Sequence, residues 1–546
     1  MWGNKRGGWL SDMTPQLWPH RYSGSRVRVW PLTVFVIGVG LLLIFRLAQL
    51  TLIEGKWRRT LADENRIFTL PLMAQRGILT DRNGIPLTRN VPLYRRQVPG
   101  TNPAEFKYEP VDRETALTLL TDPNEKVSFD VGRQYPCGEA CAPVIGYVSE
   151  VTGDDLQDHQ EYRVGELVGK IGAEKAMERL LRGQPGEEYL EINARGKAVR
   201  SVGIKQPQSG NTVKTTIDVG LQQVLYQAFE GKSGAAVAIV PQTGEILALV
   251  SSPTYDPEHL RLSLTKPGLP FFNRALGGTY APGSTFKIVT AMAALEEKTI
   301  TTTTLFEDTG EINVGGSRFG NWLYDEHGRT EGAVDVTKAL TRSNDIFFYH
   351  AGESVGPEKM GEWAANIGYG KLWNLSAWGE TAGLVPTPAW KLASRGERWY
   401  LGNTYHMAIG QGDVLATPLQ VTVMTGAIAA RGVVCPPRFV IGESPIACQQ
   451  LNLHDQTIDT IISGMIGACQ PGGTGVPFFK FSPQVACKTG TAQQGGEKDL
   501  PHAWFTVFAP ADNPTIALTV LVENGGQGSE VAAPIAKKGI EYWLSK

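Results

Sequence analysis

The chain has 546 residues, of which 19% are charged and 42% are hydrophobic, and its formal net charge is −2. These values are typical of a globular protein with about two to four domains, and they exclude a disordered or collagen-like chain. With the charge so near zero we expect no nucleic acid partner.

The first predicted element is a membrane-spanning helix at residues 30–53. The run from Pro31 to Ile53, interrupted by Arg46 and Gln49, would extend about 34 Å as a helix, enough to cross a bilayer. The preceding segment carries one acid, Asp12, and five basic residues, Lys5, Arg6, Arg21, Arg26 and Arg28. This bias predicts a cytoplasmic tail at 1–29 and places the rest of the chain outside. The competing interpretation is a cleaved signal peptide, but no Ala-x-Ala site follows the apolar run.

The sequence of residues 54–225 predicts a β-rich pedestal domain of the dimerisation type, and it contains no catalytic features. Short strand-like runs alternate with turns, and Asn83-Gly84 is a strong signal for a tight turn. Apolar residues recur on one face of a predicted helix from Gly172 to Leu181. A spacer or docking domain is the expected role.

Residues 226–546 predict one compact α/β domain. Apolar runs at 235–240 and 245–250 form a hairpin pattern, and three more strands are predicted at 485–491, 504–509 and 516–522. A long helical middle, with a buried helix at 287–295, separates the two groups, and a helix at 531–544 closes the domain. We therefore expect one antiparallel sheet, completed from both ends of the domain, with helices on both faces.

The first chemical motif is Ser284-Thr285-Phe286-Lys287, after the helix entry Pro282-Gly283. Lys287 shares a helix face with Ser284 and, when neutral, can take the serine proton. Burial and a cationic Lys488 would both lower the pKa of Lys287. A similar string, Ser263-Leu264-Thr265-Lys266, lacks the Pro-Gly entry, and we interpret Ser263 as a surface residue.

Two further motifs follow in order. Ser343-Asn344-Asp345 lies on a predicted loop, where the serine hydroxyl can pass a proton between Lys287 and a leaving amine. Lys488-Thr489-Gly490-Thr491 lies in a predicted strand, where Lys488 and the threonine hydroxyls can hold a carboxylate and Gly490 leaves room for a substrate backbone. The N–H groups of Ser284 and Thr491 would form an oxyanion hole. The predicted catalytic residues are Ser284, Lys287, Ser343, Asp345 and Lys488, and the predicted substrate-binding residues are Asn344, Thr489, Gly490 and Thr491.

Together these motifs are those of penicillin-recognising serine enzymes, and the chain resembles a class B penicillin-binding protein over nearly its full length. Other matching segments are Arg76-Gly77 with Asp81-Arg82-Asn83-Gly84, Asn273-Arg274-Ala275, Gly410-Gln411-Gly412, Thr417-Pro418-Leu419-Gln420, Gly472-Gly473-Thr474-Gly475 and His502-Ala503-Trp504-Phe505. The resemblance implies a penicillin-binding/β-lactamase-like transpeptidase fold. It also implies a peptidoglycan D,D-transpeptidase, with D-Ala-D-Ala carboxypeptidase as a side activity, in which Ser284 attacks the penultimate D-Ala carbonyl of a stem peptide on the lipid-linked glycan. Penicillins and other β-lactams would acylate the same serine.

Three features favour the elongation type, penicillin-binding protein two, over the division type. These are Ser343-x-Asp345 in place of Ser-x-Asn, the string Gly410-Gln411-Gly412, and the interval of 59 residues from position 284 to position 343. For this type the resemblance implies a role in cell shape and partnership of the pedestal and membrane helix with a SEDS-type glycosyltransferase and other cell-wall synthesis proteins. It also implies a single-pass protein of the bacterial inner membrane with a periplasmic catalytic domain.

Other functions remain open. A β-lactamase or an antibiotic sensor shares this kind of active site, but the chain has no Glu-x-x-Leu-Asn string and only one predicted span. A non-catalytic scaffold that activates a glycosyltransferase would not need Ser284, Lys287 and Lys488.

Cysteines and candidate metal ligands complete the prediction. Cys137 with Cys141, and Cys435 with Cys448, lie close enough in sequence to form disulfides, although buried thiols are an equal alternative. Cys487 stands where the family usually has glycine, and strand alternation predicts that it points away from the substrate. We expect no cofactor and no metal. Some elongation-type relatives carry a metal site between the first two motifs, but Leu340 stands where they have a cysteine, and we interpret Asp308, Asp325 and His327 as solvated loop residues. The glycines at 472–475 are interpreted as a turn.

Overall fold

The computed structural model describes residues 30–57, 67–99, 106–120, 122, 125–162, 165–192, 198–442, 447–493 and 500–546. The predicted tail at 1–29 lies outside these residues. The chain forms two compact units, one of Met1–Pro71 with Glu187–Lys205, the other of Leu72–Gly186 with Gln206–Lys546. The predicted boundary between residues 225 and 226 stays a prediction.

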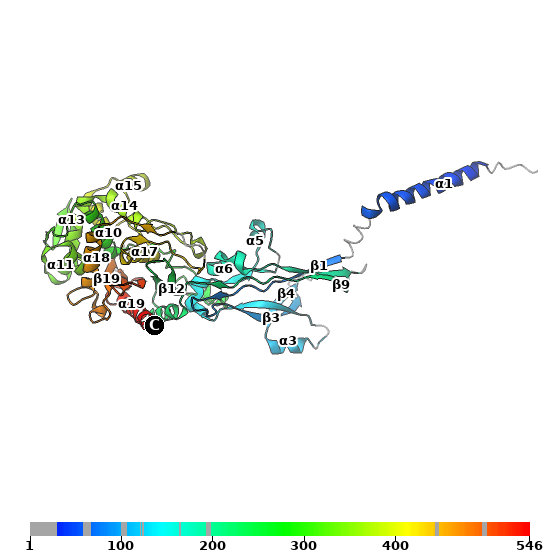
Figure 1. The fold of residues 1–546 in the computed structure, drawn as a ribbon, viewed down its shortest axis with the longest axis horizontal. Helices are drawn as coiled ribbons and strands as arrows, with labels where there is room; N and C mark the ends of the chain where they lie inside the picture. Colours follow the sequence, from blue (N-terminus) through cyan, green and yellow to red (C-terminus); the bar gives the residue numbers. More distant parts are fainter. Residues whose placement is uncertain are drawn as a thin grey trace, which may run out of the picture. The chain divides into compact units, whose positions relative to one another are not determined.

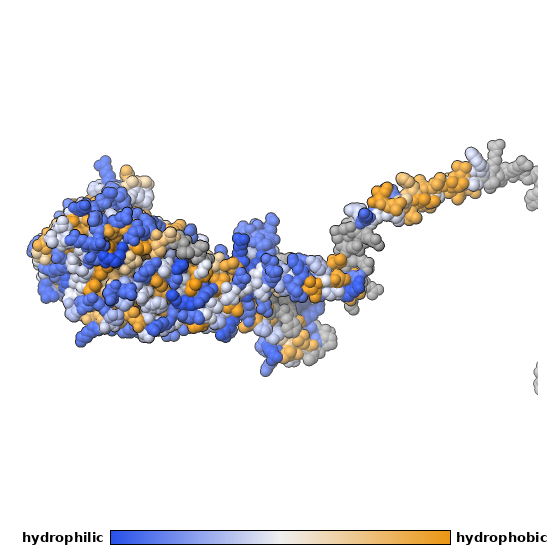
Figure 2. All heavy atoms as spheres, in the orientation of Figure 1, coloured by the Kyte–Doolittle hydropathy of each residue, from blue (hydrophilic) through white to orange (hydrophobic). Residues whose placement is uncertain are grey.

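The first unit contains one long apolar helix and a small sheet. Helix α1 (Trp30–Ala48) continues into the π-helical turn η1 (Gln49–Ile53), and the 24 residues together are long and apolar enough to cross a membrane. None of them is buried, and Figure 2 shows this helix as mainly hydrophobic along its length. The sheet has the order β1-β8-β9, from β1 (Ile67–Leu72), β8 (Gly186–Ile192) and β9 (Ala198–Lys205).

The second unit begins with short β-elements, as predicted for a pedestal. Strand β3 (Arg89–Pro99) pairs antiparallel with β4 (Phe106–Val111) and β5 (Val127–Gln134), and two-stranded sheets join β2 (Leu79–Thr80) to β10 (Val213–Lys214) and β6 (Val148–Glu150) to β7 (Leu167–Gly169). The short helices here are α3 (Arg113–Leu119), η2 (Gly138–Cys141), α4 (Ala142–Ile145) and α5 (Gly153–Asp158). Gly84 has a φ of +89°, which confirms the turn predicted at Asn83-Gly84.

The helix predicted from Gly172 to Leu181 is divided. It forms α6 (Gly172–Ala176) and α7 (Glu178–Leu181), because Met177 leaves the helical region with φ −102° and ψ 15°. Glu174 on α6 is fully buried, and its carboxylate accepts hydrogen bonds from Arg76 Nε at 2.6 Å and Arg133 Nε at 2.7 Å. An ion-pair cluster, rather than an apolar helix face alone, therefore holds this part of the pedestal.

The catalytic sheet is antiparallel, with the order β12-β11-β21-β20-β19. Its strands are β11 (Gly234–Ile239), β12 (Ile246–Ser252), β19 (Ala486–Ala492), β20 (His502–Ala509) and β21 (Ile516–Val522). Gly234 at the start of β11 pairs with Val522 at the end of β21, so segments from both ends of the domain complete one sheet, as predicted.

Helices cover both faces of this sheet (Figure 1). On one face, α8 (Val219–Ala228) and α19 (Ala532–Leu544) pack with Ala236, Ala238 and Leu518 in one apolar core. On the other, α10 (Lys287–Glu296) and α17 (Pro418–Ala429) share a core with Val237 and Leu521. The predicted α/β fold with helices on both faces is confirmed.

The segment between the two groups of strands is mainly helical. Its further helices are α9 (Leu260–Ser263), η3 (Gly283–Thr285), α11 (Trp322–His327), α12 (Val336–Arg342), α13 (Asp345–Val355), α14 (Pro357–Asn366), η4 (Ser376–Trp378), α15 (Pro388–Arg395), α16 (Leu401–Ala408), α18 (Asp455–Ala468) and η5 (Val476–Phe478). Three small hairpin-like pairs accompany them: β13 (Phe306–Asp308) with β16 (Gly332–Val334), β14 (Glu311–Val314) with β15 (Ser317–Gly320), and β17 (Val433–Val434) with β18 (Gln449–Gln450).

Candidate active site

The first and third motifs lie against each other. Ser284 is in the turn η3 that leads into α10, and it is partly exposed. Gly283 beside it has a φ of +54°, and a Cβ there would lie 2.8 Å from the carbonyl oxygen of Thr491 on β19. A Cβ on Gly490 would likewise lie 3.1 Å from Thr285 Cγ2. These glycines permit the close approach of the Ser284 turn to the strand, as an oxyanion hole would require.

The second motif connects the two lysines. Lys287 Nζ donates to the carbonyl oxygen of Ser343 at 2.8 Å and to its Oγ at 3.3 Å. Lys488 Nζ donates to the same Oγ at 2.8 Å. Ser343 is held at a φ of +57°, a left-handed conformation that is uncommon for a residue with a side chain. Its hydroxyl therefore bridges two amines that come from different elements.

Burial dominates the electrostatics of these amines. Lys287 and Lys488 are both fully buried. Burial lowers the pKa of Lys287, while the carboxylate of Asp345, 2.8 Å away, opposes this effect. Burial also lowers the pKa of Lys488 well below its usual range, and the nearby Lys287 lowers it further. The pKa of Lys287 is thus lowered by burial, as expected. The predicted contribution of a cationic Lys488 to this shift stays a prediction.

The side chain of Asn344, a predicted substrate-binding residue, makes hydrogen bonds within the protein. Its Oδ1 accepts from the backbone N–H of Phe347, which caps α13, and its Nδ2 donates to Asp308 Oδ2 at 2.9 Å. Its assignment to substrate binding stays a prediction.

Of the three residues considered as metal ligands, one is buried although all three were expected to be solvated. Asp308 is 3% exposed and accepts hydrogen bonds from Asn321 Nδ2, Asn344 Nδ2 and two backbone N–H groups, so its interpretation as a solvated residue is wrong. Asp325 and His327 on α11 have partly exposed side chains that pair with Arg318 and Glu326. Within the described ranges, no group of three or more His, Cys, Asp or Glu side chains is placed to hold a metal ion.

Cys487 is buried in the core between the sheet and α19, on the face of β19 opposite to Lys488, as strand alternation predicted. It forms a disulfide with Cys469 that was not predicted from the sequence. The two pairs left open, Cys137–Cys141 and Cys435–Cys448, are also disulfides.

Ser263, in the second Ser-x-x-Lys string, is not a surface residue. Ser263 is fully buried, and its Oγ accepts a hydrogen bond from the backbone N–H of Asp256 at 3.1 Å. The interpretation of Ser263 as a surface residue is therefore wrong. Its hydroxyl stabilises a local turn.

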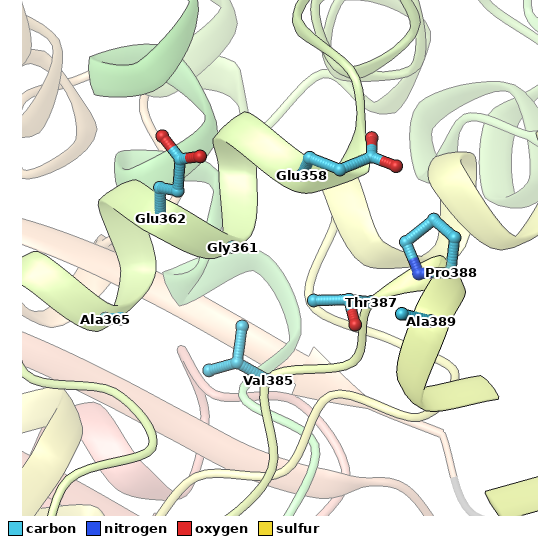
Figure 3. A pocket seen from close by; sticks show the side chains of 8 residues that line it. All are labelled: Glu358, Gly361, Glu362, Ala365, Val385, Thr387, Pro388 and Ala389. Carbon is cyan, nitrogen blue, oxygen red and sulfur yellow. The ribbon is translucent and has the colours of Figure 1, made fainter. Parts of the chain in front are cut away.

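A separate hollow of about 510 Å³ lies between α14 and the start of α15 (Figure 3). Glu358, Gly361, Glu362, Ala365, Val385, Thr387, Pro388 and Ala389 line it. None of the predicted site residues is among them, so this hollow is distinct from the motif site.

Family models and known relatives agree with the geometry. Residues 234–541 match the model of the penicillin binding protein transpeptidase domain, and residues 123–215 match that of the penicillin-binding protein dimerisation domain. The peptidoglycan D,D-transpeptidase MrdA of Acinetobacter baumannii is 33% identical over 95% of this chain and 88% of its own length, and that of Escherichia coli K12 is 31% identical over 90% and 89%.

Solved structures show the same similarity. PBP2 of Helicobacter pylori, in its complex with MreC, has a TM-score of 0.78 and 27% identity, covering 88% of this chain and 99% of that one. A chain of a peptidoglycan synthase complex that coordinates polymerization and crosslinking has a TM-score of 0.75 and 29% identity, covering 95% and 99%.

The chain belongs to the penicillin-binding protein transpeptidase family. Within class B of that family it is an elongation-type peptidoglycan D,D-transpeptidase, an enzyme of peptidoglycan biosynthesis.

Proposed function

We propose that Ser284 is the nucleophile of this transpeptidase and that Lys287, Ser343, Asp345 and Lys488 move and hold its proton. The supporting observation is the Ser343 hydroxyl, which lies within hydrogen-bond distance of both buried lysines while the Ser284 turn abuts Thr491. A serine, a neutral amine one turn away and a bridging hydroxyl are the parts that acyl transfer needs.

The reaction proceeds in two steps, acylation of Ser284 and transfer of the acyl group to the acceptor amine. Ser284 Oγ bonds to the penultimate D-Ala carbonyl carbon, Lys287 accepts the serine proton, and a proton passes through Ser343 to the departing D-Ala nitrogen as its C–N bond breaks. An amine of a second stem peptide then attacks the acyl carbon and gives up one proton to Lys287 through Ser343. The ester bond breaks, and Lys287 returns a proton to Ser284 Oγ, which restores the free serine. The N–H groups of Ser284 and Thr491 stabilise the oxyanion in both steps. Thr489, Gly490, Thr491 and Asn344 line the substrate side, where the free carboxylate of the donor faces Lys488.

Labelling with a fluorescent penicillin tests this assignment. Wild-type protein should give a stable label, and Ser284→Ala should abolish it with the fold intact. Ser263→Ala, which alters the other Ser-x-x-Lys string, is the matched control and should keep the label. A labelled Ser284→Ala would overturn the assignment, rapid loss of the label would indicate a β-lactamase, and an unlabelled wild type would indicate a scaffold.

The location we propose is the bacterial inner membrane, with residues 30–53 as an uncleaved anchor, residues 1–29 in the cytoplasm and the catalytic domain outside. The three disulfides support an oxidising compartment for the domain. Alkaline phosphatase fused at the C-terminus should be active, because this reporter requires disulfides of its own. An inactive fusion would contradict this topology.

As partner we propose a SEDS-type glycosyltransferase that contacts the pedestal and the membrane helix, beside other cell-wall synthesis proteins. A structural neighbour that belongs to a peptidoglycan synthase complex supports this proposal. Co-purification of the full chain with a tagged glycosyltransferase from the same bacterium should fail when the pedestal ion pairs are disrupted by Glu174→Gln. Retained binding would show that the pedestal core is not needed.

A further inference from the structure

The disulfide Cys469–Cys487 joins the end of α18 to β19, directly beside Lys488. Cys469 caps the C-terminus of α18, and Cys487 is the second residue of β19. Both side chains are fully buried, and their Cα atoms are 5.8 Å apart. The bond closes a stretch of chain that contains Gly472-Gly473-Thr474-Gly475, here called the glycine loop.

The glycine loop rests directly on the sulfur atoms. A Cβ on Gly475 would lie 2.8 Å from Cys487 Sγ and 3.4 Å from Cys469 Sγ. A Cβ on Gly473 would lie 2.4 Å from the carbonyl oxygen of Ala468, which also accepts a hydrogen bond from Gly475 N. Gly473 is therefore packed against the end of α18, and Gly475 is packed against both sulfurs, so the path of the loop at Gly475 depends on the disulfide.

The same loop contacts the third motif and the residue before the second motif. Thr489 Oγ1 donates to Thr474 Oγ1 at 2.7 Å, between the two glycines. Arg342, which precedes Ser343, donates from Nη1 to the carbonyl oxygen of Gly472. The two threonine hydroxyls share one hydrogen bond, so one hydroxyl hydrogen stays available for a carboxylate in the site.

We propose that Cys469, Cys487 and Thr474 are positioning residues for substrate binding, and that they act through the hydroxyl of Thr489. The disulfide holds the glycine loop against β19, and the loop holds Thr474 beside Thr489. When the carboxylate of the donor peptide or of penicillin binds, the two hydroxyl hydrogens turn, so that Thr474 donates to Thr489 and Thr489 donates to the carboxylate. This inference rests on the proposed active site. It assigns the disulfide to the binding step, because Ser284 and Lys287 lie on the separate elements η3 and α10.

The test measures penicillin acylation of the full chain by stopped flow, which separates the dissociation constant of the first complex from the acylation rate constant. Cys469→Ala with Cys487→Ala should weaken the first complex about five- to tenfold, the loss expected for one well-placed hydrogen bond, with a nearly unchanged rate constant. Thr474→Val should do the same with the disulfide intact. The triple variant should lose no more than either parent, since all three residues act through one contact.

Cys435→Ala with Cys448→Ala is the matched control, because it removes a different disulfide and should leave both constants unchanged. Peptide mapping of non-reduced protein should show Cys469 linked to Cys487. Free thiols, additive losses in the triple variant, or a loss confined to the rate constant would each overturn the proposal. Should the double cysteine variant fail to fold, Thr474→Val decides alone, and binding equal to wild type refutes it. Failure of the proposed active site is distinguished by a labelled Ser284→Ala.

Discussion

Lys287 and Asp345 form an ion pair of 2.8 Å in which the lysine side chain is fully buried and the aspartate side chain is 14% exposed. The carboxylate raises the pKa of the amine while burial lowers it. Asp345 therefore raises the pH at which the buried Lys287 amine loses its proton, although burial keeps the pKa below its usual value.

Asp345→Asn should move the acid limb of the pH profile of acylation toward lower pH. Without the carboxylate, the pKa of Lys287 falls, and the neutral amine persists in more acidic solution. Acylation rates across a pH series measure the shift. Asp325→Asn, at an exposed side chain on α11, should leave the profile in place, and a shift of the Asp345→Asn profile toward higher pH would contradict the role of Lys287 as base.

Lys488→Met should raise the free energy of unfolding by about 1–4 kcal/mol near neutral pH while abolishing acylation. The pKa of Lys488 is lower in the folded than in the unfolded protein, so the unfolded chain binds more protons and the lysine destabilises the fold. This destabilisation fades as pH rises toward the unfolded-state pKa, and the advantage of methionine should fade with it. Denaturant unfolding at several pH values measures both effects. Lys359→Met, in an exposed pair with Glu362, should change stability by less than about 0.5 kcal/mol. An advantage that grows with pH would refute this account.

Glu174→Gln should lower the free energy of unfolding by about 3–5 kcal/mol, because it leaves the buried guanidinium groups of Arg76 and Arg133 without their shared carboxylate. Thermal unfolding monitored by circular dichroism measures the loss. Glu150→Gln breaks an ion pair with Arg95 whose glutamate is 58% exposed, and should cost less than about 1 kcal/mol. Equal losses of unfolding free energy in both variants would contradict a special contribution from the burial of Glu174.

Asn344→Ala should lower the free energy of unfolding by about 0.5–2 kcal/mol, since the side chain caps α13. Penicillin binding measures whether it also serves the substrate. A weaker first complex would support the predicted binding role. Unchanged binding together with lost stability would restrict Asn344 to the cap and to its contact with Asp308.

The motifs and the sheet could be predicted because each rests on local pattern. The strands expected at 235–240 and 245–250 are β11 and β12, and the helix expected at 531–544 is α19, which spans 532–544. Alternation along one strand was enough to place Cys487 opposite Lys488. These features depend on neighbours within a few residues of each other.

What could not be predicted depends on contacts between distant segments. Cys469 and Cys487 are 18 residues apart in sequence, and only the fold brings α18 against β19. Asp308 was misjudged because its partners Asn321 and Asn344 become neighbours only after the chain has folded. The charge of Lys287 likewise depends on the approach of Asp345, which periodicity does not reveal.

The pairing of Gly234 with Val522 has a consequence for biogenesis. A ribosome adds residues from the N-terminus, so β11 emerges long before its neighbour β21 exists. Strand β11 must wait with one open edge until nearly the whole polypeptide has been synthesised, and that edge offers a template for wrong pairing during the interval. Chaperones that bind exposed strand edges would therefore act on this chain before β21 has been made.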